Sequence, residues 1–520
     1  MHKALLFNNH NIISQRPGGV YRIATFLREH DWDIEVVDWT PYWELDELKE
    51  LARQRITKET IFVGFSCFFS YWDDGNDAFC AWLKETFPHI KIILGAGTKP
   101  VITSKDIDYF VYGFGENAIL AIVSSLTGNT PGTGIKFDPD FFGTKTKVVN
   151  GNDHYPSFPL RSLMIKYEDR DYIDSAEWLS IEFGRGCIFE CTFCNFPVLG
   201  VKGDYSRDAD DFVLQLRDAY DRFGVTNYYA ADETFNDRSE KITKFANVVD
   251  QLPFRPFFSG FIRADLMVSR PQDWEPLMRL GFLGHFYGIE TFNHQTGKFI
   301  KKGMHPDKLK EGILKAKDYF LSNDRKLYKG IMSLILGLPY ETKETLQNTA
   351  DWLCTYWKDE CADMNPFEIP TDEKMNKLSI IGKDHSKFGY TELNEELWME
   401  ENFAFNRGYG RKNLIWKNEH MDYNWTRRFA QDFFKRPDTP SGLNPWALNA
   451  PMQTGMSLDE VIKLNMLGFD GSEWGERVKE NFVKYKAKKL GVDISEINQN
   501  IKNIEFYDPS DKFERGLPKK

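Results

Sequence analysis

Residues 180–197 read SIEFGRGCIFECTFCNFP and set Cys187, Cys191 and Cys194 in a C-x3-C-x2-C arrangement. Thiolates are soft ligands that suit iron–sulfur clusters. Three thiolates occupy three irons of a cubane and leave the fourth iron open to a substrate or cofactor. The cysteines follow an expected strand, and Gly186 allows the chain to turn tightly around the ligand. The stretch therefore predicts a 4Fe–4S cluster with one open iron.

A structural zinc site and three unrelated cysteines would also be compatible with this spacing. Structural zinc sites usually have four Cys or His ligands. No fourth residue of these types lies near the three cysteines at ligand spacing. The sequence favours the open cluster over zinc.

A repeated alternation of strands and helices extends from about residue 176 to beyond residue 360. The expected strands are at 177–184, 227–232, 257–264, 285–290 and 329–339, with 364–370 as a candidate sixth strand. Apolar residues at helical spacing lie between them. Such repeated βα units predict a full or partial parallel barrel of α/β class, with its chemistry on the carboxyl-terminal rim.

The first 130 residues show a separate alternation of the same kind. The expected strands are at 3–9, 33–39, 60–69, 91–97 and 108–114. Apolar strands that alternate with helices predict a doubly wound parallel sheet of Rossmann or flavodoxin-like type. A ligand of such a sheet is expected at the carboxyl ends of its strands.

The chain is therefore expected to have four parts. They are a Rossmann-like domain at 1–130, a linker at 131–175, the barrel at 176–375 and a mainly helical C-terminal region at 376–520. The linker is expected because the sequence GNTPGTG and two prolines interrupt the alternation there.

Composition and charge indicate a soluble cytoplasmic protein. The net charge of −11 argues against sequence-independent nucleic-acid binding, which needs a dominant basic face. No secretory signal peptide is expected at the N-terminus, and no apolar run approaches the ~18 residues of a membrane span. The seven cysteines are an odd number and are thinly spread outside the tight cluster, which favours a reducing compartment over a disulfide framework.

The chain resembles the radical S-adenosylmethionine (SAM) superfamily, whose signature is C-x3-C-x-aromatic-C. Phe193 fills the aromatic position. Four further segments match in order: AADETF (230–235), FIRADLM (261–267), GHFYGIETFNHQTGKFIKKGM (284–304) and ILGLPYETKETL (335–346). The subgroup that the chain resembles carries an N-terminal domain of cobalamin-binding type.

The resemblance implies that the open iron chelates the amino and carboxylate groups of SAM. The implied SAM contacts are Phe193 and the backbone of Gly337 at the adenine, Asp232 and Glu233 at the amino group, Arg263 at the carboxylate, and Glu290 at the ribose. Structural roles compete at three of these positions. Asp232 is also placed to cap a helix, and Arg263 and Glu290 are candidates for an ion pair inside the barrel.

The resemblance also implies a reaction. The reduced cluster would cleave SAM to methionine and a 5′-deoxyadenosyl radical, which abstracts hydrogen from an unidentified substrate, with a small molecule as one candidate class. A flavodoxin or ferredoxin would supply the electron. The alternatives are a non-catalytic Fe–S or zinc scaffold and an RNA-modifying radical SAM enzyme, the latter suggested by basic and aromatic residues at 406–417 and 427–436.

Whether the protein binds cobalamin decides which class of reaction is expected, and the sequence leaves this question open. The segment GENAILAIV (115–123) matches the cobalamin-binding type, but His10 lacks the Asp and Gly of the D-x-H-x-x-G ligand motif. With cobalamin, methyl transfer is expected; without it, rearrangement, oxidation or ring closure. Methylthiotransfer is disfavoured because Cys67 and Cys80 are expected in the core, not on a second cluster.

A second metal site is also disfavoured by the sequence. Cys354 and Cys361 are expected on one helix face, a spacing that suits two core positions. His385 is the candidate for a third ligand if such a site exists.

Overall fold

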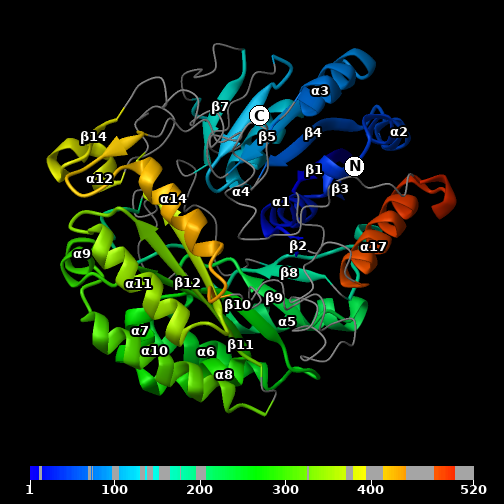
Figure 1. Cartoon of the computed structure of the whole chain (residues 1–520). Coiled ribbons are helices and arrows are strands. Elements are labelled where there is room, and N and C mark those ends of the chain that lie inside the picture. The colour runs from blue at the N-terminus through cyan, green and yellow to red at the C-terminus, as the bar shows by residue number, and fades with distance from the viewer. Residues whose placement is uncertain are drawn as a thin grey trace.

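The computed structural model describes residues 1–10, 15–67, 72, 74–96, 105–128, 135–137, 145–151, 164–175, 177–194, 206–324, 327–369, 379–393, 414–440 and 473–497. Two parallel sheets organise them, one from the N-terminal part of the chain and one from its middle (Figure 1). The α/β fold class is confirmed.

The first sheet has the strand order β3-β1-β4-β5-β6-β7, and all its pairings are parallel. Its strands are β1 (His2–Asn9), β3 (Trp32–Asp38), β4 (Thr60–Cys67), β5 (Lys91–Ala96), β6 (Tyr109–Tyr112) and β7 (Lys147–Asn150). The first five strands along the chain follow the flavodoxin-like order. The predicted sheet type is therefore confirmed.

Alternate side chains of β1 pack into two different hydrophobic cores. Leu6 lies in the core that includes residues of α1 (Gly18–Arg28) and α4 (Glu116–Leu126), whereas Phe7 lies in the core that includes residues of α2 (Leu45–Arg55) and α3 (Asp74–Thr86). Because successive side chains of a strand point to opposite faces, helices cover both sides of this sheet.

β7 lies inside the segment that the sequence predicts as a linker. Its residues Lys147–Asn150 pair with Tyr109–Tyr112 of β6 and extend the first sheet. Val148 and Val149 are fully buried. The predicted linker therefore contains a strand that the sequence analysis did not expect. The boundaries of the four parts of the chain stay predictions.

The second sheet has the order β2-β8-β9-β10-β11-β12-β13, again with parallel pairings. Its strands are β2 (Gln15–Arg16), β8 (Trp178–Ile181), β9 (Asn227–Ala230), β10 (Phe257–Ile262), β11 (Phe282–Glu290), β12 (Lys329–Leu336) and β13 (Cys361–Pro366). The sheet ends at β2 and β13, so the predicted partial barrel is confirmed.

Helices connect successive strands of the partial barrel. They are α5 (Ala209–Phe223), α6 (Ser239–Val249), α7 (Ala264–Ser269), α8 (Trp274–Leu280), α9 (His294–Phe299), α10 (Pro306–Leu321) and α11 (Lys343–Tyr356). Helices α6, α8, α10 and α11 lie together on the outer side of the sheet (Figure 1). Aromatic rings fill much of the space beneath the strands, as where Phe235 stacks on Phe282 with ring centroids 4.5 Å apart.

Two details of the barrel differ from the sequence-based expectation. β13 begins at Cys361, so the prediction that Cys354 and Cys361 share a helix face is wrong: Cys354 lies in α11 and Cys361 in a strand. β2 comes from the first domain, where Gln15–Arg16 follow β1 and pair with β8. The hydroxyl of Ser180 also donates to the Arg16 carbonyl over 2.9 Å. The end of β1 is thereby joined to the barrel edge.

The described part of the C-terminal region is mainly helical, as predicted. It comprises α12 (Ile380–Lys383), the 3-10 turn η7 (His385–Phe388), β14 (Thr391–Glu392), β15 (Trp416–Lys417), α14 (Tyr423–Phe434) and α17 (Glu473–Leu490). α14 packs on β13, whereas α17 contacts α2 of the first domain (Figure 1). Among the described residues, no helix is long and apolar enough to cross a membrane.

Trp416 packs against the turn after β12. A Cβ on Gly337 would lie 2.2 Å from Trp416, and Gly337 has a φ of +88°. Gly337→Ala is expected to lower the free energy of unfolding, since it adds a steric overlap to left-handed backbone strain. Gly389→Ala is the matched control, because Gly389 has a φ of +84° and open space around its Cβ position. In denaturant titrations, Gly337→Ala should cost about 1–3 kcal/mol more than the control; equal costs would contradict the packing of Trp416.

Candidate functional site

The cysteine loop begins where β8 ends, at the carboxyl end of the parallel sheet. Cys187, Cys191 and Cys194 form no disulfide bond; Cys191 is buried and the other two are half-buried. The Cys194 N–H donates to the Cys191 carbonyl over 3.1 Å, which closes a turn between them. Gly186 has a φ of +99°, in the left-handed region expected for a tight loop. Three thiols of one loop thus lie at the rim where the barrel's chemistry is expected.

The arrangement of the three thiols can be compared with what a single metal ion and a 4Fe–4S cubane each require. Within the part of the chain that the structure describes, no three Cys, His, Asp or Glu side chains form a group that could hold a single metal ion. The same holds for Cys354, Cys361 and His385. A cubane places its thiolates on three different irons, so its ligands need not converge on one ion. The soft donor set and its place in one loop fit a cubane.

Arg263 follows β10 and its side chain lies against the cysteine loop. Its Nη1 donates to Cys191 Sγ over 3.5 Å, while Nε and Nη2 donate to the two carboxylate oxygens of Asp265 over 2.8 and 3.0 Å. Burial acts to lower the pKa of the Arg263 guanidinium, but the hydrogen bonds and charges of Asp265 and Cys191 raise it above its ordinary value. Arg263 is therefore a fixed cation beside a predicted cluster ligand.

Asp232 follows β9 and bonds to the neighbouring strand end. Its Oδ2 accepts from the Phe183 N–H over 2.8 Å, and Lys241 lies 3.8 Å from its Oδ1. Burial raises the pKa of Asp232 to about 6. The next two helical segments have Thr234 and Arg238 as N-caps. The helix-cap alternative for Asp232 is therefore wrong.

Glu233 differs from Asp232 in its access to solvent. Its side chain is exposed, yet desolvation by the surrounding protein, followed by the charges of Asp232 and Glu182, raises the pKa of Glu233 to about 7. The Glu233 carboxyl is therefore accessible to solvent but closely surrounded by protein atoms. The Thr234 side chain beside it also approaches Cys187, with 3.8 Å between Oγ1 and Sγ.

Glu290 ends β11 in a left-handed conformation, with a φ of +66°. The pairing with β12 shifts register between Gly288 and Glu290, a bulge that redirects the strand end. Lys302 donates from Nζ to Glu290 Oε1 and to the Gly288 carbonyl, both over 2.7 Å. The predicted ion pair of Arg263 with Glu290 is therefore wrong: each has a nearer partner of its own.

Phe193 lies close to this second ion pair. Lys302 Nζ is 5.9 Å from the centre of the Phe193 ring. The residue expected at the adenine and the residue expected at the ribose are thus brought together through Lys302.

Gly337, whose backbone is predicted to approach the adenine, is hydrogen-bonded within the protein. Its N–H donates to Glu341 Oε2 over 2.8 Å, and its carbonyl accepts from the Tyr390 hydroxyl over 2.7 Å. Glu341 is buried, which raises its pKa to about 7, and its other oxygen accepts from Thr291 over 2.6 Å. Both backbone groups of Gly337 therefore have partners within the protein, and an adenine contact there stays a prediction.

Sequence reasoning did not single out four residues of this region: Asp265, Lys302, Glu341 and Tyr390. The first three lie inside the matched segments FIRADLM, GHFYGIETFNHQTGKFIKKGM and ILGLPYETKETL, so a charged residue in a matched segment was the available signal. Tyr390 lies in the C-terminal region, where no motif pointed to it.

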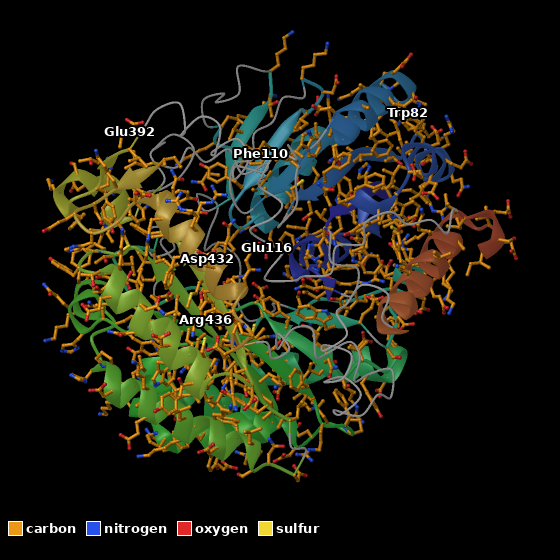
Figure 2. All side chains as sticks on the ribbon, viewed as in Figure 1. Trp82, Phe110, Glu116, Glu392, Asp432 and Arg436 are labelled. Carbon is orange, nitrogen blue, oxygen red and sulfur yellow. The ribbon has the colours of Figure 1, made fainter. Side chains whose placement is uncertain are left out.

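Glu116 links the first domain to the cysteine loop. It is the first residue of α4, and its Oε1 lies 2.7 Å from Arg185 Nη2 and 3.5 Å from Arg22 Nε. Figure 2 shows Glu116 between the first sheet and the barrel. Burial raises the pKa of Glu116, but the two guanidinium groups outweigh it and lower the pKa. The loop that carries the cysteines is thus tied to the N-terminal domain.

The carboxyl end of the first sheet holds His10. Its side chain is buried, with 3.2 Å between Nε2 and Gln15 Oε1. Asn9 donates to Cys67 Sγ over 3.4 Å. Residues 11–14, which follow His10, lie outside the described residues. Cys67 and Cys80 are buried in one core cluster, so their predicted core positions are confirmed.

Residues 181–353 match the model of the Radical SAM superfamily. A putative methylthiotransferase of Methanocaldococcus jannaschii is 27% identical over 215 residues, which cover 40% of this chain and 45% of that protein. An uncharacterized methyltransferase of Synechocystis sp. is 28% identical over 137 residues, 25% of each chain. The chain spans less than half the length of these curated relatives.

Two solved structures share the fold over nearly the whole chain. The radical SAM methyltransferase TsrM from Kitasatospora setae, with tryptophan substrate and a SAM analog, has a TM-score of 0.60 at 13% identity, covering 94% of this chain and 100% of TsrM. The cobalamin-dependent radical SAM enzyme OxsB, with aqua-cobalamin, has a TM-score of 0.54 at 14% identity, covering 94% of this chain and 80% of OxsB. Residues 181–353 are thus a Radical SAM domain, the kind that uses a 4Fe–4S cluster and SAM, and the fold of the chain around this domain is the one that TsrM and OxsB share.

Proposed function

We propose that this protein cleaves SAM reductively at a 4Fe–4S cluster held by Cys187, Cys191 and Cys194. The observation that supports the proposal most is that three cysteines of one loop lie at the carboxyl end of the parallel barrel, with the Arg263 guanidinium hydrogen-bonded to one of their sulfurs. When bound and reduced, the cluster supplies an electron to the SAM sulfonium, which yields methionine and a 5′-deoxyadenosyl radical for hydrogen abstraction. A flavodoxin or ferredoxin in the cytoplasm is the proposed reductant.

The chain's own residues would bind and orient SAM. Glu233, next to the Thr234 that approaches Cys187, is placed to accept from the SAM ammonium group, a charge-assisted contact. Lys302 orients Glu290 by donating to its Oε1, so that the second carboxylate oxygen can accept from a ribose hydroxyl. Phe193 offers an apolar face for the adenine.

We further propose methyl transfer to a small molecule with cobalamin on the first domain. The support is the fold shared with TsrM, a methyltransferase, and with OxsB, which is cobalamin-dependent. The pairing of β2 with β8 also places the carboxyl end of β1 beside the barrel. A cofactor on that end would therefore lie near the rim that carries the cysteines.

Two alternative functions have less support. Methylthiotransfer, suggested by the name of one relative, would need further cluster ligands in the first domain, and Cys67 and Cys80 are buried there in the core. RNA modification is suggested by two basic segments. Residues 427–436 cover the end of α14 and the two residues after it. Arg427 is buried there, and Arg436, which Figure 2 labels, pairs with Asp351 over 2.9 Å. Residues 406–413 lie outside the described residues.

Anaerobic reconstitution with iron and sulfide, followed by an assay for 5′-deoxyadenosine, tests the proposal. Equal amounts of methionine and 5′-deoxyadenosine are expected with a reductant. A cobalamin requirement, together with S-adenosylhomocysteine as a further product, would select the methyl-transfer branch. A protein that binds a full cluster and leaves SAM intact in every condition would instead be a scaffold.

Glu233→Gln is expected to weaken SAM binding without loss of cluster iron. A hydrogen bond to a charged group contributes about 1.5–3 kcal/mol, which corresponds to about tenfold or more in affinity. The carboxyl has a pKa of about 7, so it gains a proton as the pH falls below about 7. Wild-type affinity should fall with it, whereas the variant should show a flat profile. Equilibrium dialysis against SAM measures both, with exposed Glu240→Gln as the control. Unchanged affinity in Glu233→Gln would remove Glu233 from the site.

A further inference from the structure

Almost every N–H of the Arg263 side chain has a hydrogen-bond partner within the protein. Of the five N–H groups of a guanidinium, four have partners: two bind Asp265, one binds the Lys301 carbonyl over 2.9 Å and one binds Cys191 Sγ. The side chain is only 7% exposed. Its fork is therefore filled by a carboxylate of the chain itself.

This arrangement argues against the predicted role of Arg263 at the SAM carboxylate. A guanidinium binds a carboxylate best through two parallel N–H groups on one edge. Asp265 already occupies such an edge over 2.8 and 3.0 Å. The remaining edge of the group faces the Cys191 sulfur and the backbone of Lys301.

Further contacts hold the guanidinium in this place. Its Cζ lies 3.9 Å from the centre of the Phe189 ring, a cation–π contact within the cysteine loop itself. Lys301, whose carbonyl it binds, has a φ of +64° and pairs with Glu190 of the same loop over 3.4 Å. Arg263 is thus held against residues 189–191 of the cysteine loop, directly to Phe189 and Cys191 and through Lys301 to Glu190.

From these contacts we infer that Arg263 is a positioning residue that sets the reduction potential of the cluster, through its charge and its N–H bond to the Cys191 sulfur. The inference rests on the proposed cluster ligands. Reduction adds negative charge, which a nearby cation and an N–H donor to a ligand sulfur stabilise. Arg263 therefore makes the cluster easier to reduce by an external donor.

Arg263→Gln, made in the full chain and reconstituted anaerobically, tests the inference by redox titration monitored by EPR. The equilibrium constant for reduction should fall about tenfold, which is a shift of about 59 mV to lower potential for one electron. SAM affinity of the oxidised cluster should stay at the wild-type value. Arg217→Gln removes an equal charge from the exposed surface of α5 and should leave the potential unchanged.

Two results would overturn the inference: an unchanged potential with wild-type SAM affinity, or an unchanged potential with a tenfold loss of SAM affinity, which would return Arg263 to the SAM carboxylate. If Arg263→Gln fails to assemble a cluster, Arg263→Lys is the variant that tests the inference. Lysine keeps the positive charge but lacks the several N–H groups needed to bind Asp265 and Cys191 at the same time. It should shift the potential in the same direction by less, and a wild-type value would count against the inference. A wild-type protein without a cluster would instead contradict the proposed function itself.

Discussion

Replacing Cys191 by alanine is expected to abolish cluster assembly and, with it, the cleavage of SAM. Cys191 is the buried member of the three thiols and the acceptor of the Arg263 N–H. Its removal takes one of only three proposed ligands from the cubane and leaves a buried cation facing a void. Loss of an outer-shell partner already costs about 10–100-fold in metal affinity or activity, so loss of a ligand should cost more than about 100-fold. Iron content and 5′-deoxyadenosine formation measure the two effects.

Cys354→Ala is the matched control for this variant. Cys354 is buried in α11, away from the cysteine loop, so its replacement by alanine removes a buried thiol without removing a proposed cluster ligand. It should keep its iron and its activity while losing some stability. If Cys191→Ala cleaves SAM at the wild-type rate, the cluster ligands are wrongly assigned. Equal iron loss in both variants would point to misfolding.

The sheets were predictable because their signal is local. Runs rich in Val, Ile and Phe between amphipathic helices predicted five strands of the first sheet and the six main strands of the barrel, and the cysteine spacing predicted their functional rim. β2 has two residues and β7 has four. Strands of that length carry no periodicity, and tertiary pairing alone establishes them.

The partners of the charged site residues were harder to predict. Arg263 and Glu290 were expected as SAM contacts or as an ion pair with each other, whereas their partners in the structure are Asp265 and Lys302, which are set by loop conformation. Positive φ values at Glu290 and Lys301 shape those loops, and no sequence pattern marks them in residues other than glycine. Residue type predicted the chemistry, and the three-dimensional structure determined which groups meet.

The interface between the two sheets contains a fully buried cation, Arg16 of β2. Its Nη1 binds Asp38 over 2.6 Å and its Nη2 binds Glu177 over 2.9 Å. Arg16 also lies over the Trp39 and Tyr485 rings, with its Cζ 4.5 and 5.2 Å from their centres. These partners come from the first domain, the segment before β8 and helix α17. One side chain therefore joins three parts of the chain.

Other buried polar contacts surround the same point. The Tyr485 hydroxyl accepts from the Asp38 N–H over 2.8 Å, and Lys489 of α17 donates to the Val36 carbonyl over 2.7 Å. Burial raises the pKa of Glu177 to about 7 even though Arg16 acts to lower it. The carboxylates at this interface thus depend on Arg16 for their charge balance.

Arg16→Met is expected to lower the free energy of unfolding by about 3–5 kcal/mol, since removing one partner leaves buried charge without compensation. The penalty should depend on pH. With Arg16 present, the pKa of Glu177 is about 7, above the ~4.3 of an unfolded Glu, and without Arg16 it rises further. Both proteins therefore lose stability from about pH 4.3 to about pH 7, and above that only the variant continues to lose it, because its folded state keeps the extra proton. Denaturant titrations at pH 5 and pH 8 should show the larger loss at pH 8. Adding Asp38→Asn and Glu177→Gln should restore much of the stability, because a neutral buried cluster carries no unpaired charge. Equal losses at both pH values, or no recovery in the combined variant, would mean that Arg16 acts through its packing on Trp39 and Tyr485 and not through its charge.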